Sequence, residues 1–201
     1  MKLIEPVDNY PEKYWLSYDH GTNIDHLSFQ ECKLISGSDL PVQLSLKQKV
    51  GLSAFRKYDY LFSDGPDIIT SRLFNIFLGM GLEGEIQFVP ACIVINGDVY
   101  NDYYAVNYLA SESAFDMERC IYKPLIKSLP DGPKRFSRIV LQDIEPTHSI
   151  FRALESMSRI VVSNRAAESL QDKAVIGICF VEGRDDMSVS YTHLTLPTNR
   201  E

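Results

Sequence analysis

Asp143, Glu145 and His148 have the side-chain types of acid–base catalysis and lie close together in the sequence. On a strand, residues two apart point to the same face, so Asp143 and Glu145 would be neighbours that can exchange a proton with a substrate. No second histidine and no arginine motif accompanies them, and a solvated edge explains the pair better. A small hydrolase or transferase that uses Asp143, Glu145 or His148 remains the alternative function.

A second polar group, Asp19, His20, Asp25 and His26, contains the residue types that bind metal ions. The two histidines are six residues apart, a spacing that matches neither helical ligand pairs nor the usual zinc motifs. We expect the two rings on opposite faces of a strand-to-turn segment. Turn formation around Gly21 therefore explains these residues better than a metal site.

The usual catalytic and nucleotide-binding motifs are absent from the sequence, including the nucleophile elbow, the P-loop and H-E-x-x-H. Its four cysteines are widely spaced and form no C-x-x-C pair, so we predict reduced, buried thiols (Cys32, Cys92, Cys120 and Cys179). We expect no catalytic residues, no cofactor and no metal ligand, and hence no enzymatic activity.

The charge and hydrophobicity of the chain limit its partners. The 201 residues are 45% hydrophobic and carry a formal net charge of -7, without a run of lysine and arginine. This balance disfavours nucleic acid as a partner. It suits a basic protein partner, and equally a solvated surface that promotes solubility. Neither a secretion signal nor an apolar run of about 20 residues is present, so we expect a cytoplasmic protein without membrane contact.

Residues 60–108 give the clearest structural pattern. Ser63 or Asp64 is a predicted helix cap, followed by Pro66 and Asp67 in the first turn. Apolar residues at steps of three and four then predict one buried helix face (Ile69, Leu73, Ile76, Phe77 and Met80). Strands at 85–95 and 99–109 should follow, joined by a tight turn at 96–97, where Asn-Gly favours the positive φ angles of a hairpin.

The returning strand of this hairpin is rich in tyrosine. By strand alternation Tyr100, Asp102, Tyr104 and Tyr108 share one face. Aromatic residues beside acidic ones are typical of protein interfaces, so these four are the predicted partner-binding residues. The alternative is that the tyrosines are half-buried strand residues with hydrated hydroxyl groups.

The C-terminal third repeats this order of elements. Residues 159–163 predict a strand, 165–172 a helix capped by Ser163 or Asn164, and 175–182 a closing strand. Gly177 with Phe180 and Val181 corresponds to Gly84 with Phe88 and Val89. We predict an α+β fold, an antiparallel or mixed sheet with short helices and two similar strand–helix–strand units, although any two such units look alike at this level.

Three segments make up the predicted domain organisation. Residues 1–46 are a variable N-terminal segment packed on the core, and 47–187 form the main α+β domain. Residues 190–201, SYTHLTLPTNRE, resemble a peptide that arises when sequencing-adapter DNA is translated. We therefore expect residues 188–201 to be a non-native tail that takes no part in the fold.

A family resemblance extends over residues 47–181. The segments DYLFSDGPDIIT, GEIQFVPA, YYAVNYLASESAFDMERC and IFRALESMSRIVVSNRAAESLQDKAVIGICF resemble the eleventh class of bacterial polymorphic-toxin immunity proteins. The matching positions are mostly hydrophobic and turn residues. The resemblance implies a cytoplasmic protein that binds and neutralises a cognate secreted toxin without catalysis. It transfers no functional residues, because the family has no agreed set.

Overall fold

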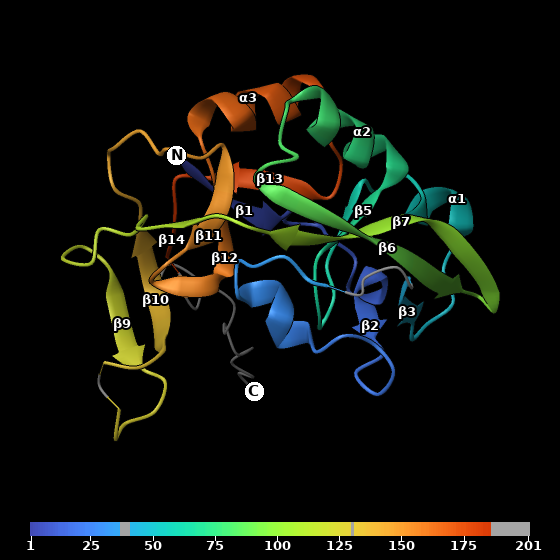
Figure 1. Cartoon of the computed structure of the whole chain (residues 1–201), viewed down its shortest axis with the longest axis horizontal. Helices are drawn as coiled ribbons and strands as arrows, with labels where there is room; N and C mark the ends of the chain where they lie inside the picture. The colour runs from blue at the N-terminus through green and yellow to red at the C-terminus, as the bar shows by residue number, and fades with distance from the viewer. Residues whose placement is uncertain (37–40, 130, 186–201) are drawn as a thin grey trace, which may run out of the picture.

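The computed structural model describes residues 1–36, 41–129 and 131–185. The predicted tail at 188–201 lies outside the described residues. Within them the chain forms fourteen strands, three short α-helices and two 3-10 turns, and both parallel and antiparallel strand pairs occur. The α+β fold with mixed sheets and short helices is therefore confirmed (Figure 1).

The six-stranded sheet contains the tyrosine-rich hairpin at its centre. Its strand order is β2-β3-β6-β7-β5-β4. Strands β6 (Ile86–Ile95) and β7 (Asp98–Tyr108) are the longest pair, and Asn96 and Gly97 in their turn both have positive φ, as predicted. The other strands are β2 (Leu16–Tyr18), β3 (Val42–Leu46), β4 (Tyr60–Leu61) and β5 (Ile68–Thr70).

The five-stranded sheet joins the two ends of the described chain. Its order is β13-β1-β12-β11-β8, so the N-terminal strand β1 (Lys2–Pro6) lies between two C-terminal strands. The other members are β8 (Ser111–Glu112), β11 (Ile150–Ala153), β12 (Ser156–Val162) and β13 (Ile178–Val181). Residues 1–46 thus contribute an interior strand, β1, to this sheet and two strands, β2 and β3, to the six-stranded sheet.

The two sheets contain equivalent strand–helix–strand units. In one, β5 leads through α2 to β6, and β7 lies antiparallel between β5 and β6. In the other, β12 leads through α3 to β13, and β1 lies antiparallel between them. A hairpin partner flanks each first strand, β4 beside β5 and β11 beside β12. The predicted similarity of the two units therefore extends to strand order.

The helices of the two units lie on the same side of the molecule (Figure 1). Both are nine residues long, α2 at Ser71–Gly79 and α3 at Asn164–Asp172. A hydroxyl side chain caps each, since Thr70 accepts a hydrogen bond from the Leu73 amide and Ser163 from the Ala166 amide. The third helix, α1 (Leu52–Phe55), and the 3-10 turns η1 (Glu12–Tyr14) and η2 (His26–Gln30) pack elsewhere.

The predicted start of the first helix was wrong. The helix begins at Ser71 instead of near Pro66, because residues 68–70 pair with β7 and form strand β5. Ser63 does not cap a helix; its hydroxyl donates to the Pro66 carbonyl and accepts from the Gly65 amide within a turn. The predicted cap of the second helix, Ser163, is confirmed.

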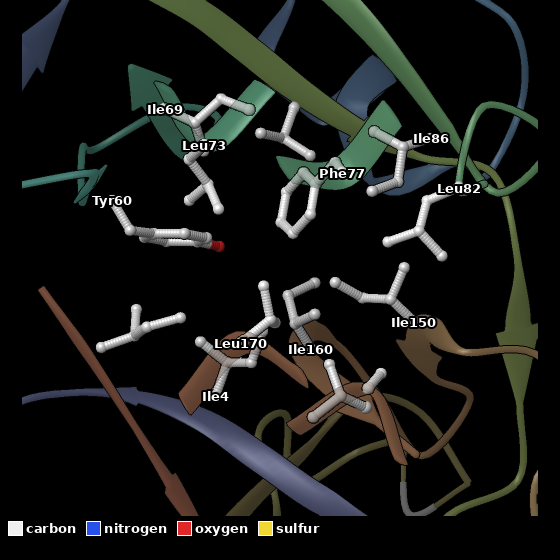
Figure 2. Packing of buried hydrophobic residues seen from close by; sticks show 14 of the residues in the cluster. Ile4, Tyr60, Ile69, Leu73, Phe77, Leu82, Ile86, Ile150, Ile160 and Leu170 are labelled. Carbon is white, nitrogen blue, oxygen red and sulfur yellow. The ribbon is translucent and has the colours of Figure 1, made fainter. Parts of the chain in front are cut away.

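Three apolar clusters hold the sheets together. The first lies between the sheets and includes Tyr60, Phe77, Ile4 and Leu170, which point toward one another in Figure 2. The second covers the outer face of the six-stranded sheet, and the third the outer face of the five-stranded sheet. Neighbouring residues alternate between clusters, such as Ile68 and Ile69, which shows that both sheets are buried on both faces.

A small third sheet projects from this body. Its order is β14-β10-β9, formed by β9 (Ile121–Pro124), β10 (Lys134–Val140) and β14 (Gly183–Asp185). In Figure 1 the β9–β10 hairpin extends away from the two larger sheets. Phe136 anchors it, because its ring meets Phe115 of the third cluster at 5.1 Å between centroids.

Candidate functional site

A cleft of about 620 Å³ opens between the two larger sheets. One wall comes from β1, β12 and β13 and carries Glu5, Arg159 and Cys179; the other comes from β4 and nearby loops and carries Trp15 and Asp67. Concave sites that combine apolar walls with a few polar groups are where proteins most often bind ligands. This cleft is therefore the first candidate site.

Charged residues line the floor on the β1 side. Glu5 is largely buried and accepts a hydrogen bond from Arg159 at 2.6 Å and one from Arg184 at 3.3 Å. The same cleft is also lined by Asp8 and Asp67, so its charges are mixed: three carboxyl groups and two guanidinium groups.

A chain of hydroxyl groups reaches into the opposite wall. The Tyr60 hydroxyl donates to Asp67 at 2.6 Å and lies 2.9 Å from the Tyr108 hydroxyl, which must then be the donor to Tyr60. Burial raises the pKa of Asp67 above its ordinary value, although the Tyr60 hydrogen bond and the charge of Arg152 act in the opposite direction. Burial likewise raises the pKa of Tyr60 and of Tyr108.

Arg152 lies behind this chain of hydroxyls. Its guanidinium is buried and sits 5.2 Å from the centre of the Tyr108 ring, a cation–π contact, and its Nη1 donates to the Met157 carbonyl. Its Nε has no hydrogen-bond partner in the part of the chain that the structure describes. The positive charge thus acts on Asp67 across the tyrosines.

The cysteine in the cleft is not an activated nucleophile. The Cys179 thiol donates to the Pro6 carbonyl, and burial raises its pKa above the ordinary value. A raised pKa reduces the thiolate fraction that nucleophilic attack requires. The cleft therefore provides charge, hydrogen bonds and the exposed ring of Trp15, which suit binding of a small molecule or of a partner's side chain.

The four predicted partner-binding residues do not share a face. A β-bulge between Tyr100 and Tyr103 shifts the register against β6. Tyr100 therefore packs toward the second cluster, whereas Tyr104 and Tyr108 belong to the first. This corrects the expected alternation, which the extra residue interrupts.

Their exposures also differ. Tyr108 is fully buried and presents no surface to a partner, and the half-buried Tyr104 stacks on Phe74 with 4.3 Å between ring centroids. Asp102 is exposed and forms an ion pair with Arg56 at 2.8 Å, and Arg56 also lies over the half-buried Tyr100 ring. Of the four residues, Tyr100 and Asp102 lie near the hairpin end, beside the exposed Val99, whereas one face of the equally half-buried Tyr104 is taken by Phe74.

The alternative catalytic residues lie beyond a strand end. Strand β10 ends at Val140, so Asp143 and Glu145 are exposed loop residues and not neighbours on a strand, contrary to the prediction. His148 is held by Glu112, whose carboxylate accepts from the His148 ring and from the amides of His148 and Thr147. Partial burial opposes ionisation of Glu112, but these hydrogen bonds lower its pKa. The observed role of His148 is to fix this loop.

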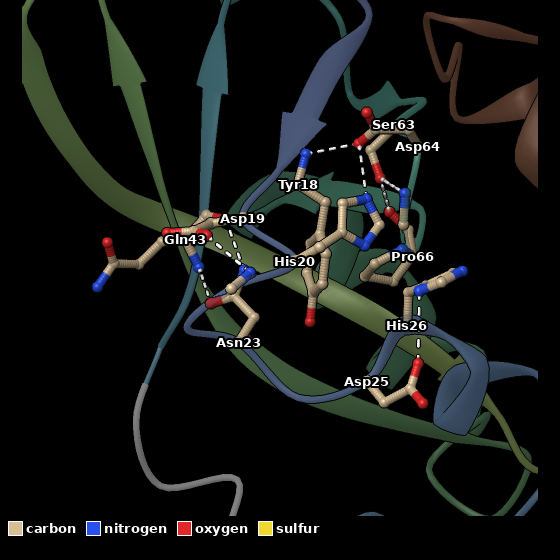
Figure 3. Close-up of polar contacts among 12 residues, drawn as sticks. Tyr18, Asp19, His20, Asn23, Asp25, His26, Gln43, Ser63, Asp64 and Pro66 are labelled. Carbon is tan, nitrogen blue, oxygen red and sulfur yellow. Dashed lines mark hydrogen bonds and ion pairs between the residues drawn. The ribbon is translucent and has the colours of Figure 1, made fainter.

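The two N-terminal histidines lie together, contrary to the prediction of opposite faces. A loop brings the rings of His20 and His26 to 4.8 Å between centroids, edge to face (Figure 3). His20 faces Asp64 at 3.8 Å, and His26 faces Asp25 at 3.4 Å. Across residues 1–36, 41–129 and 131–185, no group of three or more potential ligands has the geometry of a metal site. The four cysteines carry free thiols.

Sequence reasoning missed the residues that line the cleft. Glu5, Arg159 and Arg184 come from opposite ends of the chain and meet only because β1 lies between β12 and β13. The sequence pattern predicts Asp67 in the first turn of a helix, whereas the residue lies in the loop before β5. A signal was present for Trp15 alone, because a tryptophan among three tyrosines is typical of interfaces.

Comparison with models of known protein families gives no match to the chain, and comparison with characterised proteins gives no match either. Among the described residues, no helix is both long enough and apolar enough to cross a membrane.

Proposed function

We propose that this chain is an immunity protein that binds and neutralises a cognate toxin domain in the cytoplasm without chemistry of its own. The resemblance of residues 47–181 to polymorphic-toxin immunity proteins supports the proposal. The observation that carries it is the accessible aromatic and acidic end of the β6–β7 hairpin, with Tyr100, Asp102 and Val99. Such a combination is typical of protein-binding surfaces.

The charge of the chain supports a basic toxin. The formal net charge of -7 attracts a positively charged partner and accelerates its encounter, as with a nuclease toxin domain. Asp102 is at the surface, so it can exchange its contact with Arg56 for one with a basic residue of the toxin. Affinity would then come from a few aromatic anchors, with Tyr100 among them.

The test is co-expression with the product of the adjacent upstream gene in a sensitive host, followed by co-purification. We expect growth to be rescued and a stable complex to be recovered. Tyr100→Ala should weaken the complex by about 2 kcal/mol or more if Tyr100 is an anchor. Tyr108→Phe, which alters a buried tyrosine, is the control for indirect effects through folding. A lethal neighbour that the protein neither rescues nor binds would refute the proposal.

The alternative is a small hydrolase or transferase that acts in the cleft. The raised pKa of Asp67 and the paired arginines favour this reading, since perturbed carboxyl groups often mark active sites. The same co-purification separates the two functions. Substitution of Asp67 should leave toxin neutralisation unchanged in an immunity protein, whereas it should abolish turnover in an enzyme.

A further inference from the structure

The hairpin formed by β9 and β10, residues 119–140 and here called the arm, carries most of the clustered exposed apolar side chains. Five large apolar residues within a stretch of nine are between 38% and 63% exposed, namely Ile121, Tyr122, Leu125, Ile126 and Leu129. Single exposed apolar residues are common, but a contiguous group marks an interaction surface. The arm therefore exposes large apolar side chains that a folded core would normally bury.

The charge of the arm is opposite to that of the rest of the chain. Residues 119–138 contain six of the 20 basic residues and one of the 27 acidic ones, a net charge of +5. The remainder has 14 basic and 26 acidic residues, a net charge of -12. No basic cluster is visible in the sequence, because pairing of β9 with β10 brings these residues together.

Only part of the positive charge of the arm is compensated locally, by the ion pairs of Arg119 with Asp116 at 3.7 Å and of Arg138 with Asp185 at 3.9 Å. Lys123 lies directly opposite Arg135 in the β9–β10 pair, and like charges at such positions are unfavourable. Lys127 and Lys134 also form no ion pair with a carboxylate among residues 1–36, 41–129 and 131–185, although Lys134 lies over the Tyr122 ring. An acidic partner would relieve this repulsion.

The position of β9 adds backbone groups to this surface. It is the edge strand of its sheet and all four of its residues are exposed. Lys123 and Pro124 are residue types that protect edge strands from uncontrolled pairing. Protection of the strand edge does not explain why Leu125, Ile126 and Leu129 are exposed. These residues extend the apolar surface beyond the end of β9.

We infer that the arm is a docking surface for an acidic, apolar patch of a protein partner. This inference rests on the proposed function, because the partner it names is the toxin. In Figure 1 the arm and the β6–β7 hairpin end lie at opposite sides of the molecule. A toxin that is basic overall would meet the acidic hairpin end with one part of its surface and the arm with an acidic part.

The first test reverses charge on the arm and measures toxin binding by the full-length protein. Lys123→Glu combined with Arg135→Glu keeps a like-charge pair across the strands, so the cost to folding is matched. We expect at least a tenfold loss of affinity relative to the control below, because the acidic patch of the toxin would meet like charges on the arm. Lys47→Glu with Lys49→Glu makes the same charge change at exposed positions outside the arm and should bind like the native protein.

The second test removes apolar surface. Leu125→Ser with Ile126→Ser should accelerate dissociation of the toxin at least tenfold, with Leu27→Ser and Leu34→Ser as the exposed control pair. Arm variants that keep their thermal midpoint and bind within twofold of the native protein would overturn the inference and leave the immunity function intact. If the native protein itself binds no toxin, the proposed function fails first, and the inference falls with it.

Discussion

Asp67 forms its hydrogen bond with Tyr60 at a position where ionisation is costly. Burial raises its pKa, and only the Tyr60 hydroxyl and the more distant Arg152 favour the carboxylate. In the unfolded chain the same group titrates near its ordinary value of 3.8. The stabilisation that protonated Asp67 gives the folded state is therefore complete below about pH 3.8. It is lost as the pH rises through the elevated pKa of the folded state.

Asp67→Asn should reveal this dependence, because asparagine does not titrate. The free energy of unfolding of the native protein should fall relative to the variant from about pH 4 upward, by about 1.4 kcal/mol for each unit of pKa elevation. Urea denaturation at pH 3.5 and pH 7 measures the difference, and Asp98→Asn at the exposed first position of β7 is the control. An Asp67→Asn difference that is the same at both pH values would contradict the argument.

At the level of elements, the two units differ where their second strands begin. Gly177 has φ of +116°, and a Cβ there would lie 2.3 Å from the Tyr60 carbonyl oxygen. Gly84, which the sequence pattern placed in the equivalent position, has ordinary φ and open space around it. The matching Gly–Phe–Val patterns thus reflect similar strands but not the same backbone geometry.

Gly177→Ala should therefore lower the free energy of unfolding by on the order of 3 kcal/mol, from backbone strain and overlap with β4. Gly84→Ala should change it by about 0.5 kcal/mol or less. Chemical denaturation of both variants gives the comparison directly. Equal effects of the two substitutions would mean that the close approach of Gly177 to Tyr60 does not constrain the fold.

Asp59 connects the elements of one unit to those of the other. It is buried, and its carboxylate accepts from Thr70 at the start of α2, from Arg72 within α2 and from the Ile176 amide before β13. Arg72 also donates to the Lys173 carbonyl at the end of α3. This network connects both helices to the residue that precedes β4.

Asp59→Asn should cost about 2–3 kcal/mol, because the NH2 group of asparagine replaces one of the two accepting oxygens and leaves buried donors such as Arg72 and the Ile176 amide unpaired. Asp102→Asn breaks an exposed ion pair with Arg56 and should cost about 1 kcal/mol or less. Thermal and urea unfolding of the two variants test the contrast. A loss for Asp102→Asn as large as that for Asp59→Asn would refute the structural role assigned to Asp59.

Local signals in the sequence predict elements where short-range chemistry dominates. The Asn96-Gly97 turn and the Ser163 cap are of this kind, because their φ preferences and hydrogen bonds involve near neighbours. Pairing between strands that are distant in the sequence determines the elements that the local signals do not predict. Strand β5 forms from residues with helical spacing because β7 pairs with it, and the bulge in β7 follows from its register with β6.

At the scale of the molecule, the cleft and the basic arm arise from the pairing of strands, which local sequence patterns do not predict. The cleft needs β1 between β12 and β13, and the basic arm needs β9 paired with β10. Residue spacing predicts neither feature. The cleft depends on contacts between segments that are far apart in the sequence, and the basic residues of the arm are separated in the sequence by uncharged residues. A net charge of -7 for the chain likewise hides a basic arm on an acidic body.

The core between the sheets should make the two units unfold together. The first cluster draws residues from both units, and the N-terminal strand is inserted into the C-terminal sheet. Trp15, the only tryptophan, packs on Tyr10 and Phe62 beside the six-stranded sheet, whereas Leu170 belongs to α3 of the other unit. Tryptophan fluorescence therefore reports on one unit and a substitution at Leu170 perturbs the other.

Leu170→Ala removes a fully buried side chain and should cost about 2–5 kcal/mol. If the shared core couples the units, the fluorescence and far-ultraviolet circular dichroism transitions in urea should shift by the same amount and stay coincident. If the units are independent, the circular dichroism transition should split while the fluorescence midpoint stays at its native value. That second outcome would show that the apolar contacts between the sheets do not transmit stability from α3 to the sheet that holds Trp15.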